Sequence, residues 1–191
     1  MLNIHSKSQN LYSDNTKLTL KNLNRNVMET KPTSEKMYAL LVLFDMHTSF
    51  YSKAIVGISS RDAHNRLNTK ANHVSWLAGS LVAQRYELAK MLGISGRQTA
   101  HELFENHQGI IDNITYPSLD EFNKDWDQIS PLLRAALISV TDEKLNEQID
   151  MGPIKMTSYE MIAFIIYREA NCIGQIALWR RLLGYDAIKY D

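Results

Sequence analysis

Long stretches of this chain repeat apolar residues with the 3.6-residue period of an α-helix. Only 8 Gly and 4 Pro occur among its 191 residues, which favours helices over the turn-rich strands of a β-sandwich. The first stretch follows Lys31-Pro32-Thr33-Ser34, where Thr33 or Ser34 is a suitable helix N-cap. Its apolar stripe consists of Met37, Leu40, Leu43, Phe44, His47, Phe50, Tyr51, Ala54, Ile55 and Ile58.

Three further helices are predicted from the same periodicity and from their capping residues. The second covers residues 68–92, the third begins at the capping box Ser118–Glu121, and the fourth begins at the capping box Thr157–Glu160 and runs to Leu183. Four long amphipathic helices favour an all-α four-helix bundle. The long connection over residues 93–117 allows the second and third helices to run parallel, in an up-down-down-up order.

The rest of the chain sets the expected domain organisation. Residues 1–31 are polar and Asn-rich, which predicts a poorly ordered or loosely docked N-terminal extension, with Met28 as an alternative start. Residues 32–191 then form one domain. A short helix is expected within residues 98–107, and a helical turn and loop within residues 142–156.

Composition limits the classes of partner and the compartment. Lys+Arg and Asp+Glu balance at 21 each, so no overall charge attracts nucleic acid or an acidic membrane surface. The sequence contains no apolar run of about 20 residues that would predict a membrane span, and it begins without a signal-peptide pattern. The single Cys172 excludes an internal disulfide and a thiolate zinc site. We therefore expect a cytoplasmic protein.

One charged residue interrupts the apolar stripe of the fourth helix. Arg168 falls on the face formed by Met161, Ile165, Cys172, Ile176, Trp179 and Leu183. Burying a guanidinium without partners costs several kcal/mol. Arg168 therefore either has a counter-group, for which Asp45, Glu87 and Glu169 are candidates, or extends toward one end of the bundle, or forms the floor of an anion-binding pocket.

Other polar residues lie on or beside the predicted buried faces. His47 is interpreted as a core histidine bonded to a backbone carbonyl or a tyrosine. Ser80 and Gln84 share one side of the second helix with His73.

The turns that follow Arg168 contain two more polar candidates. Cys172 lies one turn after Arg168, where a guanidinium would favour the thiolate, although a buried cysteine is more often a small hydrophobe. Gln175 follows one turn later, and the adjacent Gly174 predicts close approach of a neighbouring helix.

Two tracts resemble a known family. Asn72-His73-Val74-Ser75-Trp76-Leu77-Ala78-Gly79-Ser80-Leu81, followed by Arg85-Tyr86, is similar to the tract N-x-x-x-W-L-x-G-H-L, then R-Y, of the DinB-like (DinB/YfiT) superfamily. Tyr167 through Ile176, followed by Arg180-Arg181-Leu182-Leu183-Gly184, is similar to its tract H-x-x-x-H-x-G-Q-I, then R-R-L-L-G. The resemblance covers about residues 35–191. It implies a four-helix bundle of a family named for induction by DNA damage. The family's members with known activity are metal-dependent enzymes, several of them thiol-dependent transferases or isomerases, and a divalent metal such as Zn or Ni is held by three His.

The sequence departs from that pattern at all three metal positions, which hold Ser80, Arg168 and Cys172. Arginine stays protonated and repels a divalent cation, so the resemblance implies a member without a metal cofactor. A compensating metal site from His47, His73 and Cys172 is the lesser alternative. The leading hypothesis is a pocket that binds a small anionic molecule or is vestigial, with the candidates His47, Ser80, Gln84, Arg168, Cys172 and Gln175.

Two rival hypotheses remain from the sequence. In the first, the protein is a thiol-dependent transferase in which Arg168 or Cys172 replaces the metal. In the second, it is a structural or interaction protein that forms a homodimer through its helix faces. A homodimer is expected under the leading hypothesis as well.

Overall fold

The computed structural model describes residues 31–152 and 154–190. The predicted N-terminal extension lies outside the described residues except for Lys31, and so does the alternative start at Met28.

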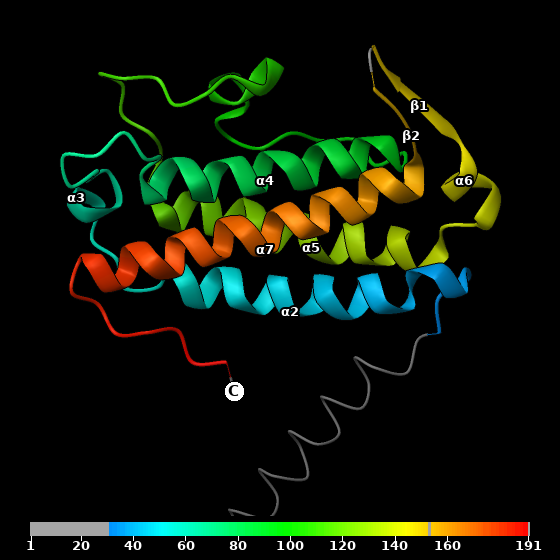
Figure 1. Cartoon of the computed structure of the whole chain (residues 1–191), viewed down its shortest axis with the longest axis horizontal. Coiled ribbons are helices and arrows are strands. Elements are labelled where there is room, and N and C mark those ends of the chain that lie inside the picture. Colours follow the sequence, from blue (N-terminus) through cyan, green and yellow to red (C-terminus); the bar gives the residue numbers. More distant parts are fainter. Residues whose placement is uncertain (1–30, 153, 191) are drawn as a thin grey trace, which may run out of the picture.

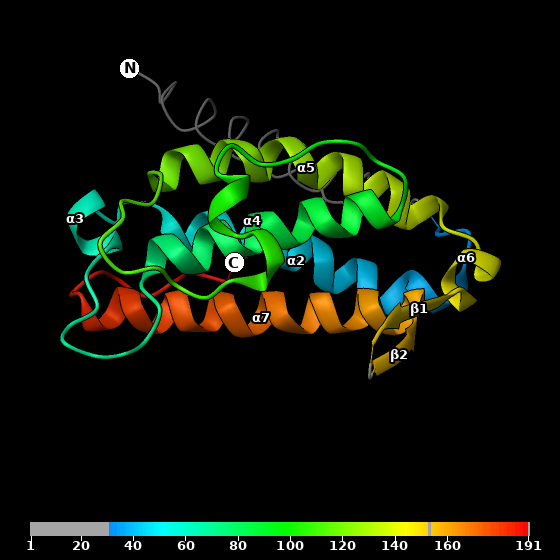
Figure 2. The same ribbon diagram turned by 90° about the horizontal axis from the view of Figure 1, so that it is seen from above.

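Four long helices dominate the structure and lie side by side (Figure 1). They are α2 (Tyr38–Ile55), α4 (Val74–Met91), α5 (Leu119–Ser139) and α7 (Ser158–Leu182). Helices α2 and α4 each pack against both α5 and α7. Helices α4 and α5 run in one direction and α2 and α7 in the other (Figures 1 and 2). The prediction of an all-α protein is confirmed.

Short elements connect the long helices. They are the 3-10 helices η1 (Glu35–Met37), η2 (His101–Leu103) and η3 (Glu105–His107), the helices α3 (Ser60–Ala63) and α6 (Asp142–Asn146), and the strands β1 (Gln148–Met151) and β2 (Ile154–Thr157). The two strands form an antiparallel hairpin in which Gln148 is paired with Thr157 and Met151 with Ile154. This hairpin was not predicted, although polar and apolar residues alternate on both sides of Gly152-Pro153.

Capping explains where the helices begin. In α5 the Ser118 hydroxyl accepts from the Glu121 N–H at 3.2 Å, and in α7 the Thr157 hydroxyl accepts from the Glu160 N–H at 3.1 Å. Both predicted capping boxes are confirmed. Ser34 does precede the first helical turn, but its hydroxyl donates to Asp142 of α6 instead of capping the helix.

The predicted start of the second helix, at residue 68, is wrong. Leu67 and Asn68 have φ of 47° and 59°, in the left-handed region that a right-handed helix excludes. The helix begins at Val74, where His73 is the N-cap and its ring accepts from the Trp76 N–H. His73 therefore lies outside the helix.

Helix α7 meets the length and hydropathy of a membrane span, with a mean hydropathy of 1.2 over its most apolar window. This finding differs from the expectation that the chain contains no such apolar run. However, α7 packs against α2 and α4 and buries the carboxylate of Glu169 among them. These features are compatible with the core helix of a soluble protein.

The contact between α4 and α5 is close at Gly79. A Cβ at this position would lie 2.3 Å from Phe104 Cζ and 2.5 Å from Phe122 Cζ, both in the buried core. Gly174, which was predicted to allow such an approach, has nothing within 4 Å of an added Cβ. The prediction for Gly174 is therefore wrong, and the close approach occurs at Gly79.

We expect Gly79→Ala to lower the free energy of unfolding by about 1–3 kcal/mol, because two aromatic rings of the core must move. Gly174→Ala is the matched control in α7. It adds the same methyl group to open space and should stabilise the protein by up to about 1 kcal/mol through helix propensity. Urea unfolding of both variants measures the difference, and equal stabilities would contradict the close packing at Gly79.

Candidate functional site

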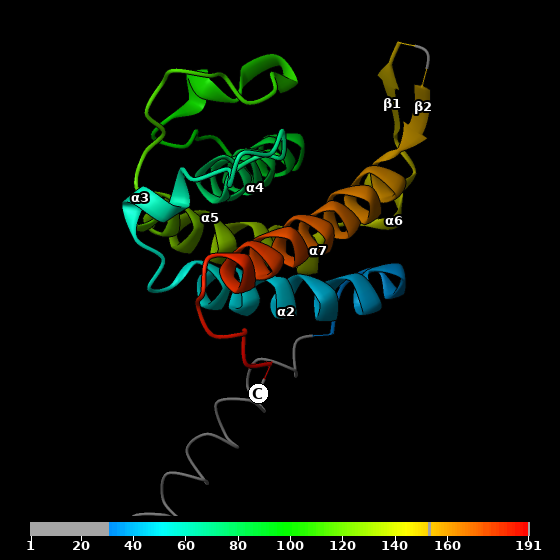
Figure 3. The ribbon, with the colours of Figure 1, turned by 60° about the vertical axis from the view of Figure 1, so that its left-hand side comes forward.

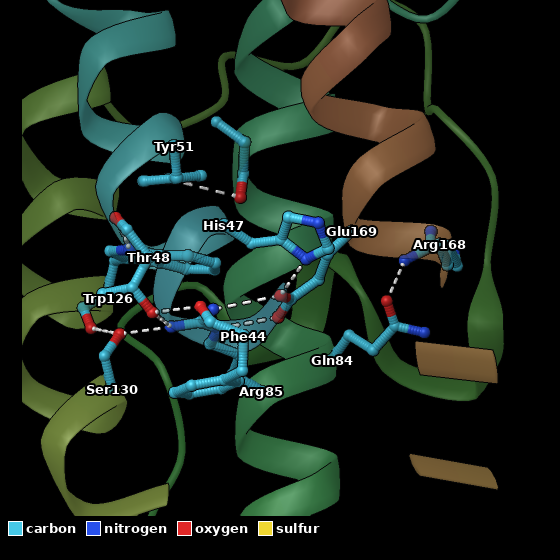
Figure 4. Close-up of polar contacts among 11 residues, drawn as sticks. Phe44, His47, Thr48, Tyr51, Gln84, Arg85, Trp126, Ser130, Arg168 and Glu169 are labelled. Atoms are coloured by element: carbon cyan, nitrogen blue, oxygen red, sulfur yellow. Dashed lines mark hydrogen bonds and ion pairs between the residues drawn. The ribbon is translucent and has the colours of Figure 1, made fainter. Parts of the chain in front are cut away.

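A buried ion pair joins α4 to α7 at the centre of the molecule. Arg85 Nε donates to Glu169 Oε1 at 2.7 Å, and the Nη2 of the same guanidinium donates to Oε2 at 3.0 Å (Figure 4). The side chain of Arg85 is 0% exposed and that of Glu169 is 1% exposed. Two parallel hydrogen bonds between charged groups give the strongest geometry for an arginine and a carboxylate.

The remaining contacts of Arg85 connect it to the other two long helices. Its Nη1 donates to Thr48 Oγ1 of α2 at 2.9 Å and to Ser130 Oγ of α5 at 2.6 Å. The guanidinium carbon also lies 4.0 Å from the ring centre of Phe44 and 3.4 Å from that of Trp126. Arg85 is thus stacked between two aromatic rings and bonded to all three neighbouring helices.

His47 completes this cluster from α2. Its Nδ1 lies 3.3 Å from Glu169 Oε2, and its side chain is buried. The interpretation as a core histidine with a partner is confirmed, but the partner is a carboxylate and not a backbone carbonyl or a tyrosine. Burial by itself would raise the pKa of Glu169, yet the neighbouring Arg85 and His47 together hold it below its usual value. Glu169 is therefore a charged carboxylate at neutral pH.

Arg168 points away from this cluster, on another side of α7 (Figure 4). It is half-buried, and its Nη1 donates to Gln84 Oε1 at 2.6 Å. Its Nη2 donates to Ser80 Oγ at 3.3 Å. The structure thus brings together three of the predicted pocket residues, Arg168, Gln84 and Ser80.

The three carboxylates predicted as partners of Arg168 are all elsewhere. Asp45 accepts from Arg134 at 2.7 and 2.9 Å, and Glu169 is paired with Arg85. Glu87 is exposed on α4. In the described parts of the chain Arg168 contacts neutral oxygens and no carboxylate. The predicted buried salt bridge of Arg168 is therefore wrong.

Cys172 is buried one turn after Arg168. Burial raises the pKa of its thiol, and the lowering effect of the nearby Arg168 does not overcome it. The expected activation of Cys172 by Arg168 is therefore outweighed, and at neutral pH the side chain is a thiol packed in the core.

Gln175 does not reach this site. Its side chain is exposed, and its amide donates to Asn171 Oδ1 at 2.7 Å on the outer face of α7. His47 is also separate from Arg168, because it belongs to the Arg85–Glu169 cluster. The six predicted pocket residues therefore do not form one site. His47 belongs to the core cluster and Gln175 to the surface. The other four, Ser80, Gln84, Arg168 and Cys172, lie at or near Arg168.

The alternative metal site from His47, His73 and Cys172 is not assembled. His73 lies at the N-terminus of α4, where Nδ1 accepts the Trp76 N–H at 3.0 Å, whereas His47 contacts Glu169. Within residues 31–152 and 154–190, no group of three or more His, Cys, Asp or Glu side chains is arranged to hold a metal ion.

The central role of Arg85 is not among the predictions from the sequence, in which Arg85 is only part of a motif. A signal was present, because Arg85 lies one turn from both Leu81 and Leu88 on the buried line of α4. It interrupts that line as Arg168 interrupts the stripe of α7. Thr48 and Ser130 carried no such signal, since single hydroxyls are common on helix surfaces.

Comparison with known proteins gives no identification. No family model matches the chain, and no curated protein matches it. The resemblance to the DinB-like superfamily therefore rests on the two tracts in α4 and α7 and stays a prediction.

Proposed function

We propose that this chain is a divergent DinB-like four-helix bundle without a metal cofactor, in which Arg168 binds a small anionic ligand. The proposed bundle order is up-down-down-up, with the long connection between α4 and α5. The helix directions support this order, because α4 and α5 run parallel to each other and antiparallel to α2 and α7 (Figures 1 and 2). The contact between Ser80 and Arg168 supports it as well, because it joins the two tracts that carry the resemblance.

The observation that carries the anion-binding proposal is the set of partners of Arg168. A fully buried guanidinium is normally paired with a carboxylate. Arg168 is half-buried and donates to the neutral oxygens of Gln84 and Ser80. These two bonds use two of its five N–H donors and fix the orientation of the plane. Among the described residues no carboxylate compensates the positive charge, and a carboxylate or phosphate oxygen suits the remaining donors.

A metal ion does not suit the same residues. Ser80 is a weak ligand, Arg168 carries a fixed positive charge, and burial keeps Cys172 as a thiol. The same thiol pKa speaks against the rival in which Cys172 is the nucleophile of a transferase. The proposed homodimer stays a prediction, because the structure is that of a single chain.

The experiment is a thermal-unfolding titration with inorganic phosphate and with acetate, at constant ionic strength set by NaCl. We expect one of the anions to stabilise the protein by about 1.4 kcal/mol at ten times its dissociation constant. The gain should disappear in Arg168→Gln. Arg181→Gln, an exposed change on the same helix, should keep it.

Two outcomes would count against this proposal. One is a tightly held, stoichiometric Zn, Ni or Fe in the purified protein, measured by elemental analysis. The other is equal stabilisation of the native protein and Arg168→Gln by both anions.

A further inference from the structure

A cavity lies on the side of α4 that faces the segment between α4 and α5. That segment crosses over the outer face of α4 and carries η2 and η3 (Figure 3). The cavity has a volume of about 330 Å³, which is within the range of small-molecule sites. None of the six residues predicted for the pocket contributes to its lining.

Two aromatic rings form the apolar part of this cavity. Tyr86 comes from α4 and Phe104 from the crossing segment, and both are buried. Gly96 completes this part, since a Cβ there would lie 3.3 Å from Cε1 of Tyr86. A planar apolar group is the kind of ligand that aromatic walls of this type accommodate.

Charged groups of both signs line the rest. Lys90 and Arg97 are cations, and Glu87 and Glu105 are carboxylates. Only Glu105 is engaged, in a contact of 3.1 Å with His101. Within the described ranges Glu87, Lys90 and Arg97 are in no ion pair. The lining therefore offers two unpaired cations for a carboxylate and a carboxylate for an ammonium group.

The backbone close to Arg97 is held against α5 by Thr99. Two residues further on, the backbone N–H of Thr99 donates to Asp125 Oδ2 of α5 at 2.8 Å. The Thr99 hydroxyl donates to Oδ1 of the same carboxylate at 3.2 Å. These bonds hold the segment that carries Arg97 against the body, so the cavity wall is formed before any ligand binds.

We propose that this cavity binds a small aromatic zwitterion of the α-amino-acid class. The ring lies against Tyr86 and Phe104, the carboxylate faces Lys90 and Arg97, and the ammonium group faces Glu87. This site is separate from Arg168, so either proposal can fail without the other.

Titration of the full, ¹⁵N-labelled chain with L-phenylalanine tests the proposal. 3-Phenylpropanoate, which lacks only the ammonium group, and phenethylamine, which lacks only the carboxylate, are the matched probes. We expect amide shifts confined to residues 83–106, and phenylalanine binding at least about tenfold tighter than either probe. Arg97→Gln should weaken phenylalanine binding about tenfold, the effect of losing about 1.4 kcal/mol of charged hydrogen bonding.

Arg61→Gln is the control, because Arg61 is an exposed arginine on α3 outside the lining. It should bind phenylalanine as the native chain does. No shifts at 10 mM phenylalanine would overturn the proposal. Equal binding of 3-phenylpropanoate and phenylalanine would overturn it too, since the carboxylates of the lining would then have no role.

Discussion

Replacing Glu169 by Gln is expected to lower the free energy of unfolding by about 3–5 kcal/mol, which is the cost of leaving one member of a buried ion pair without its partner. Arg85 would keep its charge at 0% exposure. In the native protein both carboxylate oxygens accept hydrogen bonds from Arg85. In the variant one of these oxygens is replaced by an amide nitrogen, which is a donor and cannot accept from the guanidinium. His47 would also lose the charged oxygen at 3.3 Å from its Nδ1. Chemical denaturation of the variant and the native chain measures this loss.

A second arginine–carboxylate pair in the same protein provides the control. Arg134 and Asp45 form the same two-bond contact at 2.7 and 2.9 Å, but their side chains are 26% and 29% exposed. Because water screens this pair, Asp45→Asn should cost at most about 1 kcal/mol. Equal losses in Glu169→Gln and Asp45→Asn would contradict the role of burial.

The double variant Arg85→Met with Glu169→Leu separates the pair from its surroundings. Removing both charges leaves no uncompensated ion. The double variant should therefore lose less free energy of unfolding than Arg85→Met and Glu169→Leu lose together, by about 2 kcal/mol or more. Additive losses would mean that Arg85 and Glu169 act independently, and this would contradict the ion pair.

The stability of the protein is expected to fall by about 3 kcal/mol between pH 6.5 and pH 4 because of His73. Burial, together with the positive charges of His64 and Arg66, lowers the pKa of His73 from 6.5 to about 4. In this window the unfolded chain binds a proton that the folded chain does not, so acid favours unfolding. The stability is fully present above pH 6.5 and is lost as the pH falls toward 4. Urea unfolding at half-unit pH steps measures this slope.

His73→Asn keeps the structural role and removes the titration. An asparagine oxygen can accept the Trp76 N–H, as His73 Nδ1 does at 3.0 Å. From pH 6.5 to 4 the native chain should therefore lose about 3 kcal/mol of stability relative to His73→Asn. Carboxylates that titrate in the same range cancel in this difference. A constant difference would contradict the lowered pKa of His73.

The candidate site was predictable in part. The buried position of His47, and Ser80 and Gln84 on the side of α4 that faces Arg168, follow from helical spacing. Which acid pairs with which base does not follow. Arg168 and Glu169 are neighbours in the chain, so their side chains leave α7 about 100° apart. A modest rotation of the helix about its axis decides which of the two enters the core.

The sequence by itself determined the all-α fold and the starts of α5 and α7, because periodicity and capping act over a few residues. It did not determine where α4 begins, since the left-handed backbone of Leu67 and Asn68 excludes a helix there and α4 starts only at Val74. Only the tertiary structure decided that Arg85 and Glu169, 84 residues apart, form the central ion pair. It also left Arg168 with neutral partners. Such pairings depend on how four helices are rotated against one another, and that rotation is set by the packing of the whole core.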